Sequence, residues 1–422
     1  KLYATNGPAC TNYSASARVH HINGFNTHRA IVCLSALTGN FDRVGGNVPN
    51  PASYIHKPAG FPTREHQFRS ECYPKDAPER IGAEKFPLWN ALYDEFQAVD
   101  LIRQLEEGTP YPLKGMVAFG LNAKMLPQSE RLLKAMADNL DFYVDTDIFM
   151  TMSAKYADLV LPACSSLERG EMKAYQGGFL TFTQPVIEPL YDSKSDTDIM
   201  YGMIKALKLD DELLQQGYEA CCDWIIDGCG LTVADLKKSD LPVKVPTAKW
   251  PVQAGKVLAN GFNTPSGKFE FYSNAIARIV PGLDPLPSYS DPLSDENDPE
   301  TKAKYPFYLC TGARRPHALH SRTHEVPWLR SLQPDPTVEV HNEDAKRLGL
   351  KDGDWVAMSS PYGEIRMRVK VTALAKPGVL LAIHGYTEAN VNELVGQNHV
   401  DPYTGFPGFK GLRCNIRKVE GK

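Results

Sequence analysis

Four pieces of sequence decide the fold of this 422-residue chain: GMVAFGLNA (115–123), LLKAMADNL (132–140), FYVDTD (142–147) and ADLVLP (157–162). The apolar runs 116–119, 142–144 and 159–161 are short and end at turn residues, which predicts buried strands. The second piece places Leu132, Leu133, Met136 and Leu140 on the inner face of a helix. Strands that alternate with helices in this way predict βαβ units and a parallel sheet, the α/β class.

Ligands of parallel sheets bind beyond the carboxyl ends of the strands. We therefore expect a site at the turns 120–123 and 145–151. Gly120 and Asn122 form a turn whose free N–H groups suit a phosphate, although a plain structural turn is equally compatible. Thr146 and Asp147 can bind a base or a ribose, and helix capping is the alternative.

The sequence before this stretch predicts two helices and a long irregular segment. Ile31, Leu34 and Leu37 recur with helical spacing after Asn26, a suitable N-cap, and this helix should stop at 38–40. Residues 44–87 carry many prolines and polar residues, so no regular element is expected there. Leu92, Phe96, Val99 and Ile102 then predict one helix that ends near Gly108.

The sequence after it predicts further helices and then a β-rich unit. Helices are expected at 198–207, with Met200, Ile204 and Leu207 inward, and at 212–226. Residues 241–304 are rich in Pro, Ser and Asp and should form a linker. The β-branched runs 307–309, 337–340, 355–358, 365–371 and 379–383 predict a compact β-barrel over 305–422.

Composition excludes several classes of protein. Lys plus Arg number 46 and Asp plus Glu number 50, so the net charge is −4 and no global basic surface is available for nucleic acid. No apolar run approaches the roughly 20 residues that span a bilayer, so direct membrane insertion is not expected. The nine cysteines show no C-x-x-C spacing, which disfavours a zinc ribbon and a disulfide scaffold.

The N-terminus predicts a fragment or a processed chain, because residues 1–10 contain neither an initiator Met nor a signal peptide. Scattered thiols favour the cytoplasm, whereas an upstream signal would leave the periplasm open.

The segment 311–322 concentrates polar groups: Thr311, Gly312, Arg314, His317, His320, Ser321 and Arg322. Arg presents a planar fork of donors, and His and Ser bond ring edges and phosphates. Metal ligation by His317 and His320 is a competing interpretation, but no third ligand is in register. A solvated basic loop is the remaining alternative. Asn390, Asn392, His399, Asp401 and Lys410 form a second polar group, and His384-Gly385 suggests a strand end that opens into a cleft.

Taken in order, these motifs resemble the C-terminal part of the catalytic subunit of the molybdopterin oxidoreductases, the dimethyl sulfoxide reductase and formate dehydrogenase superfamily. The motifs that match are Asn23 to Asn40 with Gly45-Gly46, 120–122, 145–151, ADLVLP (157–162) with Glu168 and Gly170, 264–270, 311–322, 345–354, and Asn392, Leu394 and Lys410.

The resemblance implies Rossmann-like parallel-sheet domains followed by a C-terminal double-psi-like β-barrel. Residues 1–50 would end one α/β domain, 51–240 would form a molybdopterin-binding α/β domain and 305–422 a dinucleotide-binding domain. The implied cofactor is molybdopterin guanine dinucleotide with Mo or W. The residues expected to bind it are Gly120, Asn122, Thr146, Asp147, Thr311, Gly312, Arg314, His317, His320, Ser321, Arg322, Asn392 and Lys410.

The resemblance assigns no metal ligand and no catalytic residue to this chain, because the family's iron–sulfur cysteines and metal ligand lie upstream of the matching part. The expected partners are therefore that N-terminal part, or a separate chain, and an iron–sulfur electron-transfer subunit. The expected activity is two-electron redox or oxygen-atom transfer, which this polypeptide alone should lack. Two alternatives stay open: a cofactor-free structural subunit and a non-redox hydratase or transhydroxylase.

Overall fold

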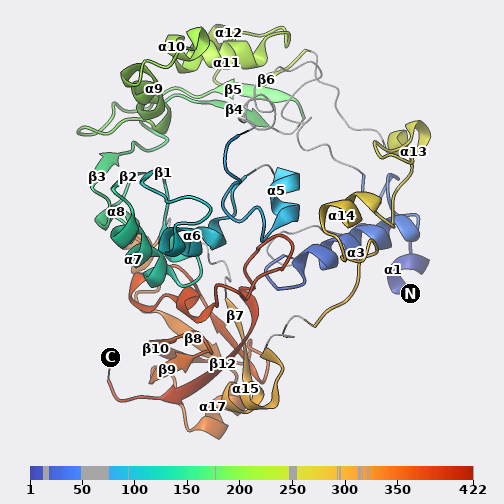
Figure 1. The fold of residues 1–422 in the computed structure, drawn as a ribbon, viewed down its shortest axis with the longest axis vertical. Helices are drawn as coiled ribbons and strands as arrows, with labels where there is room; N and C mark the ends of the chain where they lie inside the picture. The colour runs from blue at the N-terminus through green and yellow to red at the C-terminus, as the bar shows by residue number, and fades with distance from the viewer. Residues whose placement is uncertain are drawn as a thin grey trace.

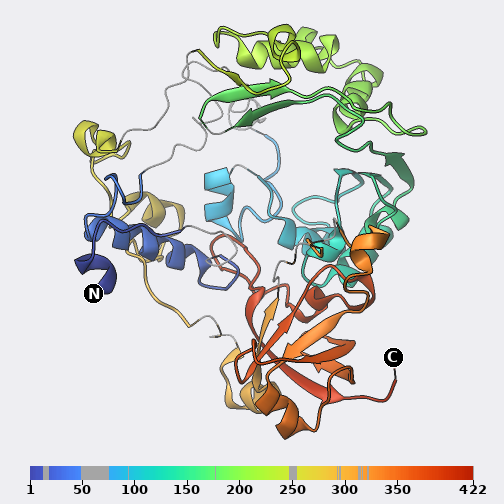
Figure 2. The ribbon, with the colours of Figure 1, turned by 180° about the vertical axis from the view of Figure 1, so that it is seen from behind.

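The computed structural model describes residues 1–12, 19–48, 76–93, 95–175, 177–246, 254–291, 293, 296–311, 315, 317–320 and 323–421. Its β-structure forms a three-stranded parallel sheet, a closed six-stranded barrel and a three-stranded antiparallel sheet. The barrel lies at one end of the long axis and the antiparallel sheet at the other, with the parallel sheet between them (Figures 1 and 2). No helix in the described part of the chain has the length and apolarity needed to cross a membrane.

The sheet is parallel, as the alternating pattern predicts, and its strand order is β1-β2-β3. Val117 pairs with Val144, and Val144 pairs with Leu159. One face of the sheet packs on the helices α6 and α7, whose buried leucines form a core with Ala118 and Tyr143. The elements are β1 (Gly115–Phe119), β2 (Phe142–Asp147), β3 (Leu159–Pro162), α6 (Leu101–Glu107), α7 (Ser129–Asn139) and the short α8 (Met152–Lys155).

The prediction of one helix that contains Leu92 and ends near Gly108 is wrong, because the structure breaks this segment into three pieces. These are α5 (Pro87–Tyr93), a 3-10 turn η2 (Ala98–Asp100) and α6. The side chain of Gln97 accepts a hydrogen bond from the Val99 N–H at 3.3 Å and so starts a new element. Leu92 and Phe96 are exposed instead of sharing a buried face. Gly108, with φ +67°, ends α6 as expected.

The first of the predicted helices, α3 (Gly24–Leu37), also differs from the prediction, and a short helix α1 (Leu2–Thr5) precedes it. Its N-cap is Asn23, and Asn26 lies inside the helix as a buried residue. The expected apolar face is largely in solvent, since Leu34 is 42% and Leu37 76% exposed.

The antiparallel sheet β4-β5-β6 carries a cover of helices on one face, where a core forms around Leu180, Ile226 and Leu236. The helix expected over 212–226 is two helices, because Gly217 adopts φ +95° between them. Met200 and Leu207 are exposed, and Ile199 is the buried residue of the preceding helix. The elements are β4 (Met172–Tyr175), β5 (Phe179–Phe182), β6 (Val243–Lys244), α9 (Asp196–Ala206), α10 (Glu212–Gln216), α11 (Tyr218–Ile226) and α12 (Val233–Lys237).

The range 241–304, expected as a linker, contains three short helices: α13 (Lys256–Asn260), α14 (Asn274–Ile279) and α15 (Pro299–Lys304). Buried Asp42 fixes the first of them to the loop after α3. Its carboxylate accepts hydrogen bonds from the N–H groups of Gly255 (3.0 Å) and Leu258 (2.8 Å). Near the other end of the range, Glu296 is buried against the barrel.

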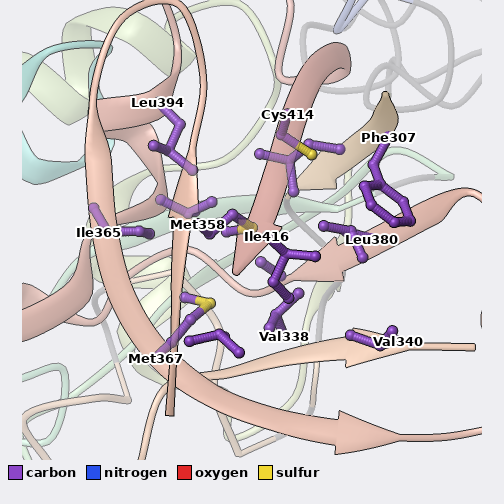
Figure 3. Close-up of a cluster of buried hydrophobic side chains, with 14 of the residues drawn as sticks. Phe307, Val338, Val340, Met358, Ile365, Met367, Leu380, Leu394, Cys414 and Ile416 are labelled. Atoms are coloured by element: carbon purple, nitrogen blue, oxygen red, sulfur yellow. The ribbon is translucent and has the colours of Figure 1, made fainter. Parts of the chain in front are cut away.

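The barrel closes in the order β10-β8-β11-β7-β12-β9. Its parallel pairs are β7 with β11 and β8 with β10. The interior is lined by alternate residues such as Ile365, Met367 and Val369 of β10, and Figure 3 shows this interior. The elements are β7 (Phe307–Thr311), α16 (Pro327–Arg330), β8 (Thr337–Val340), α17 (Asn342–Leu348), β9 (Trp355–Ser359), β10 (Glu364–Val371), β11 (Val379–Ala382), the 3-10 turns η5 (Thr387–Ala389) and η6 (Val391–Leu394), and β12 (Lys410–Lys418).

The expected fold class, an α/β part followed by a C-terminal barrel, is confirmed. The five strands expected from β-branched runs all occur, and each boundary lies within two residues of its expected position.

Candidate functional site at the junction of the parallel sheet and the barrel

The turn after β1 contains two predicted site residues. Gly120 has φ +63°, and its N–H donates to the Thr146 carbonyl at 2.7 Å. A Cβ at this position would meet no atom within 4 Å, so the space beside the turn is open. The Asn122 side chain accepts from the Lys124 N–H at 3.0 Å and caps the 3-10 turn η3 (Ala123–Met125). Asn122 therefore has the role of a plain structural turn, which the sequence analysis gives as the alternative to phosphate binding.

The end of β2 contains buried polar atoms that lack partners. Thr146 and Asp145 are fully buried. No group of the described residues forms a hydrogen bond with Thr146 Oγ1 or with either carboxylate oxygen of Asp145. Leaving such groups unpaired costs about 1–3 kcal/mol each, and native proteins contain few of them. This strand end is thus unusually rich in unsatisfied hydrogen-bonding capacity.

The two carboxylates at this strand end have shifted pKa values. Burial, followed by the neighbouring Asp147 carboxylate, raises the pKa of Asp145 to about 6. The nearby Tyr143 hydroxyl and Thr146 backbone favour the charged form of Asp145 and so offset part of this rise in its pKa. Neither of them has the geometry of a hydrogen bond to the Asp145 carboxylate. Burial also raises the pKa of Asp147, whose Oδ1 accepts from the Phe149 N–H at 2.9 Å. The sequence analysis includes Asp145 in the turn 145–151 but predicts cofactor binding only for its neighbours Thr146 and Asp147.

The barrel contacts this edge of the sheet through its loop at η6. The Nδ2 groups of Asn390 and Asn392 both donate to the Lys124 carbonyl, at 2.9 and 2.8 Å. The Gln128 N–H donates to the Asn392 carbonyl at 3.1 Å. Asn392 therefore lies beside η3, which the predicted residue Asn122 caps.

Thr311 and Lys410 lie on neighbouring strands at one end of the barrel. The Thr311 N–H and hydroxyl both donate to the Phe409 carbonyl at 3.0 Å. Lys410 pairs with Cys310, and its N–H donates to the His20 carbonyl at 2.8 Å. The ring of His20 stacks on Phe406 with 5.0 Å between centroids, which brings the chain before α3 to the same place.

The two predicted histidines have protein partners. His317 Nε2 lies 3.3 Å from Gln333 Oε1, and His320 Nδ1 lies 2.7 Å from His384 Nε2. His384 is buried, and its ring lies 4.8 Å from that of His320 between centroids. The loops of His320 and His384 follow β7 and β11, a parallel pair, which explains why they meet. Gly312, Arg314, Ser321 and Arg322 lie outside the described residues.

The loops that carry His320 and His384 approach each other so closely that a side chain at position 385 would have no room. Gly385 has φ +105°, and a Cβ would collide with the His320 carbonyl and lie 2.8 Å from His324 Nε2. Burial lowers the pKa of His324 to about 4, so this imidazole is neutral at pH 7.

A cavity of about 700 Å³ lies between the two parts of the molecule. It is lined by Met125 and Leu126 after η3, by Gln97 and Val99 of the η2 segment, and by residues 406, 407 and 409 of the barrel. Its walls are thus close in sequence to Asn122 and Lys410. Within the described ranges, no three His, Cys, Asp or Glu side chains group closely enough to hold a metal ion.

Comparisons with known proteins agree with this geometry. Residues 16–206 match the molybdopterin oxidoreductase family, and residues 307–413 match the molydopterin dinucleotide binding domain. The chain is 27% identical to acetylene hydratase of Syntrophotalea acetylenica over 96% of its own length and 56% of that protein. It is 28% identical to the dimethyl sulfoxide reductase DmsA of Escherichia coli, over 85% of this chain and 46% of that one.

The fold of a solved relative extends the comparison to three dimensions. The structure of acetylene hydratase from Pelobacter acetylenicus superposes with a TM-score of 0.84 at 24% identity, over 99% of this chain and 62% of that one. The chain spans about half the length of the curated relatives that it matches. The two matched regions together cover most of the chain, which belongs to the molybdopterin oxidoreductase family.

Proposed function

We propose that this chain supplies part of the protein cradle for molybdopterin guanine dinucleotide, in an enzyme that carries out two-electron redox or oxygen-atom transfer on a small substrate. The observation that carries the proposal is the set of unpaired, buried polar atoms at the end of β2. A ligand that provides the missing hydrogen bonds would account for such atoms in a folded chain. When the cofactor is bound, its Mo or W centre supplies the redox chemistry.

The residues at the end of β2 fit one end of such a dinucleotide. Thr146 Oγ1 can donate or accept, and the carboxylate of Asp145 accepts N–H groups of a flat heterocycle. The open space beside Gly120 lets a ligand approach the backbone without a side chain in the way. Asp147 orders the following turn through its bond to Phe149, and Asn392 holds the barrel against this edge.

The barrel residues fit the pterin part of the cofactor. Lys410 offers a cation for an anionic group, and the His320–His384 pair offers an imidazole edge that is held rigidly. Hydrogen bonds from such groups tune the electronics of a bound cofactor. An electron-transfer partner subunit is part of the proposal, supported by the relatives that are named as subunits of reductases.

A second candidate is the addition of water without net redox change, because the similarity to acetylene hydratase covers nearly the whole chain. Turnover with a reduced viologen dye as the only electron donor separates the two activities. Redox chemistry consumes electrons from the dye, whereas hydration proceeds without them. A cofactor-free structural subunit is disfavoured by the unpaired polar atoms, since nothing else satisfies them among the described residues.

The test is Thr146→Val in the full-length enzyme, which removes the hydroxyl and keeps the shape. We expect a loss of about 10-fold or more in cofactor retention, as for one hydrogen bond worth about 1.5 kcal/mol. Pterin fluorescence after release and the Mo or W content per folded protein measure it. Thr181→Val is the matched control, because Thr181 is a buried strand residue of the antiparallel sheet. Full loading of both variants would refute this placement of the cofactor.

A further inference from the structure

Strand β12 begins with an irregularity that decides where Lys410 is placed. Lys410 pairs with Cys310, whereas Leu412 pairs with the preceding residue, Leu309, so the register shifts between Lys410 and Leu412. Gly411 lies at this bulge with φ +121°. A bulge bends its strand and redirects a side chain, and bulges are frequent beside active sites. The direction of the Lys410 side chain therefore depends on how the bulge is held.

His399 holds the bulge from inside the molecule. Its Nε2 lies 3.2 Å from the Gly411 carbonyl, and because a carbonyl only accepts, Nε2 carries the hydrogen. The His399 carbonyl in turn accepts from the Gly408 N–H at 2.9 Å. A Cβ at position 408 would lie 2.5 Å from His399 Cδ2, so the loop fits tightly around the imidazole. His399 itself is completely buried.

Glu296, which belongs to the segment that the sequence predicts as a linker, faces this histidine. Its Oε1 lies 3.7 Å from His399 Nδ1, and both side chains are buried. Its Oε2 accepts from the Arg413 N–H at 2.6 Å, and its carbonyl accepts from Arg413 Nε at 3.1 Å. The carboxylate thus contacts β12 just after the bulge while it faces the imidazole that holds the bulge.

We propose that His399, oriented by Glu296, is a positioning residue that fixes the β12 bulge and thereby aims the ammonium of Lys410 into the cofactor cleft. The inference rests on the proposed function, in which Lys410 binds the anionic cofactor. It assigns a task to a buried histidine and to a buried glutamate of the segment expected as a linker. Residues that support a ligand-binding group in this way typically change affinity by about 10–100-fold when they are removed.

A double-mutant cycle in the full-length enzyme tests the inference, with cofactor retention per folded protein as the readout. His399→Leu removes the donor to Gly411, and we expect a loss of about 10-fold. Lys410→Ala should cause a loss of similar size. If His399 acts through Lys410, the double variant loses no more than Lys410→Ala alone. His399→Gln keeps a side-chain N–H that can reach the Gly411 carbonyl, so it should recover most of the retention.

Two further variants separate positioning from a general loss of stability. Val369→Ala leaves a cavity in the barrel core on β10 and should lower the melting temperature without changing retention at 25 °C. Glu296→Gln keeps an acceptor for the Arg413 N–H but removes the charge that faces His399. It should weaken retention only while Lys410 is present, which tests the inference even if His399→Leu does not fold.

The outcomes for the inference and for the proposed function are distinct. Unchanged retention in Lys410→Ala would show that Lys410 does not bind the cofactor, which removes the proposed role on which the inference rests. If Lys410→Ala loses cofactor but His399→Leu or Glu296→Gln multiplies that loss, His399 supports the barrel in general, and the positioning role is overturned. Poor rescue by His399→Gln, with normal folding, would overturn it as well.

Discussion

At the residue scale, Asp145 links the candidate site to the pH dependence of stability. Its pKa is about 6 in the folded chain, against an ordinary value of 3.8. Between these values the folded state binds more protons than the unfolded state, so stability falls as the pH rises from about 4 to about 6. At about 1.4 kcal/mol for each pH unit between the two pKa values, the ionised carboxylate lowers the free energy of unfolding by about 1–3 kcal/mol at pH 7.

Asp145→Asn should therefore raise the melting temperature of the cofactor-free protein at pH 7–8 and flatten its pH dependence between about 4 and 6. Thermal unfolding followed over this pH range measures both effects. The matched control is Asp141→Asn, because Asp141 is exposed just before the same strand. Equal effects of the two substitutions would show that the Asp145 carboxylate is not disfavoured by its burial.

The sequence could indicate this strand end but could not choose among its residues. Asp145, Thr146 and Asp147 alternate across β2, and the sequence does not show which of them finds a partner. Asp147 accepts from a backbone N–H two residues away, whereas Asp145 and Thr146 remain unpaired. Asn122 and Thr311, both predicted to bind cofactor, also make local or neighbouring backbone bonds. Only the three-dimensional arrangement of possible partners separates these cases.

At the element scale, the N-terminus of α3 receives its cap from the other end of the chain. The Asp401 carboxylate accepts from the Phe25 N–H at 2.9 Å, and it also accepts from the N–H groups of Tyr403 and Thr404 at 3.0 Å. An acidic group at this end of a helix satisfies a backbone donor and interacts favourably with the helix dipole. The loop before β12 is thereby fixed next to α3, as Figures 1 and 2 show.

Asp401→Ala should lower the free energy of unfolding by about 2 kcal/mol, because it removes a cap and leaves three partly buried N–H groups without their acceptor. Denaturant unfolding measures the change. Asp298→Ala is a suitable comparison, since Asp298 caps the short helix α15 from an exposed position and should cost less. A smaller loss for Asp401→Ala than for Asp298→Ala would contradict the long-range cap.

Elements defined by apolar alternation were predictable, whereas helix faces set by polar contacts were not. Strand β8 occurs at residues 337–340 as expected, because Val338 and Val340 alternate into the apolar interior of the barrel. Helix α3 instead packs through Ser35, whose hydroxyl lies 3.2 Å from Tyr3 Oη and 3.3 Å from Thr11 Oγ1. Its leucines remain exposed, so hydrophobic spacing indicated the wrong face.

At the scale of the whole molecule, the barrel and the parallel sheet meet through a few polar atoms. Their partners are far apart in the sequence, as for Asn390 and Lys124, which is why the sequence predicts both parts but not their contact. The Lys124 carbonyl accepts from two asparagines, and the Ser129 hydroxyl donates to Glu393. The cavity of about 700 Å³ is lined on one side by Met125 and Leu126, which directly follow Lys124 in the chain.

The double substitution Asn390→Ala and Asn392→Ala should loosen the barrel from the sheet while leaving each part folded. It removes two donors to one buried carbonyl, a loss of about 1–3 kcal/mol for the acceptor that is left unpaired. We expect at least 10-fold faster limited proteolysis between residues 241 and 304, because separation of the two parts exposes the chain that joins them. The near-ultraviolet circular dichroism of the barrel aromatics should change little.

Asn274→Ala provides the control for this experiment, since Asn274 is exposed on α14 within the same range. It should leave the cleavage rate unchanged. Added cofactor should slow cleavage in the wild-type enzyme more than in the double variant, because a ligand that bridges both parts stabilises their contact by mass action. Equal protection of both proteins would mean that these two asparagines do not help to form the proposed cofactor cleft.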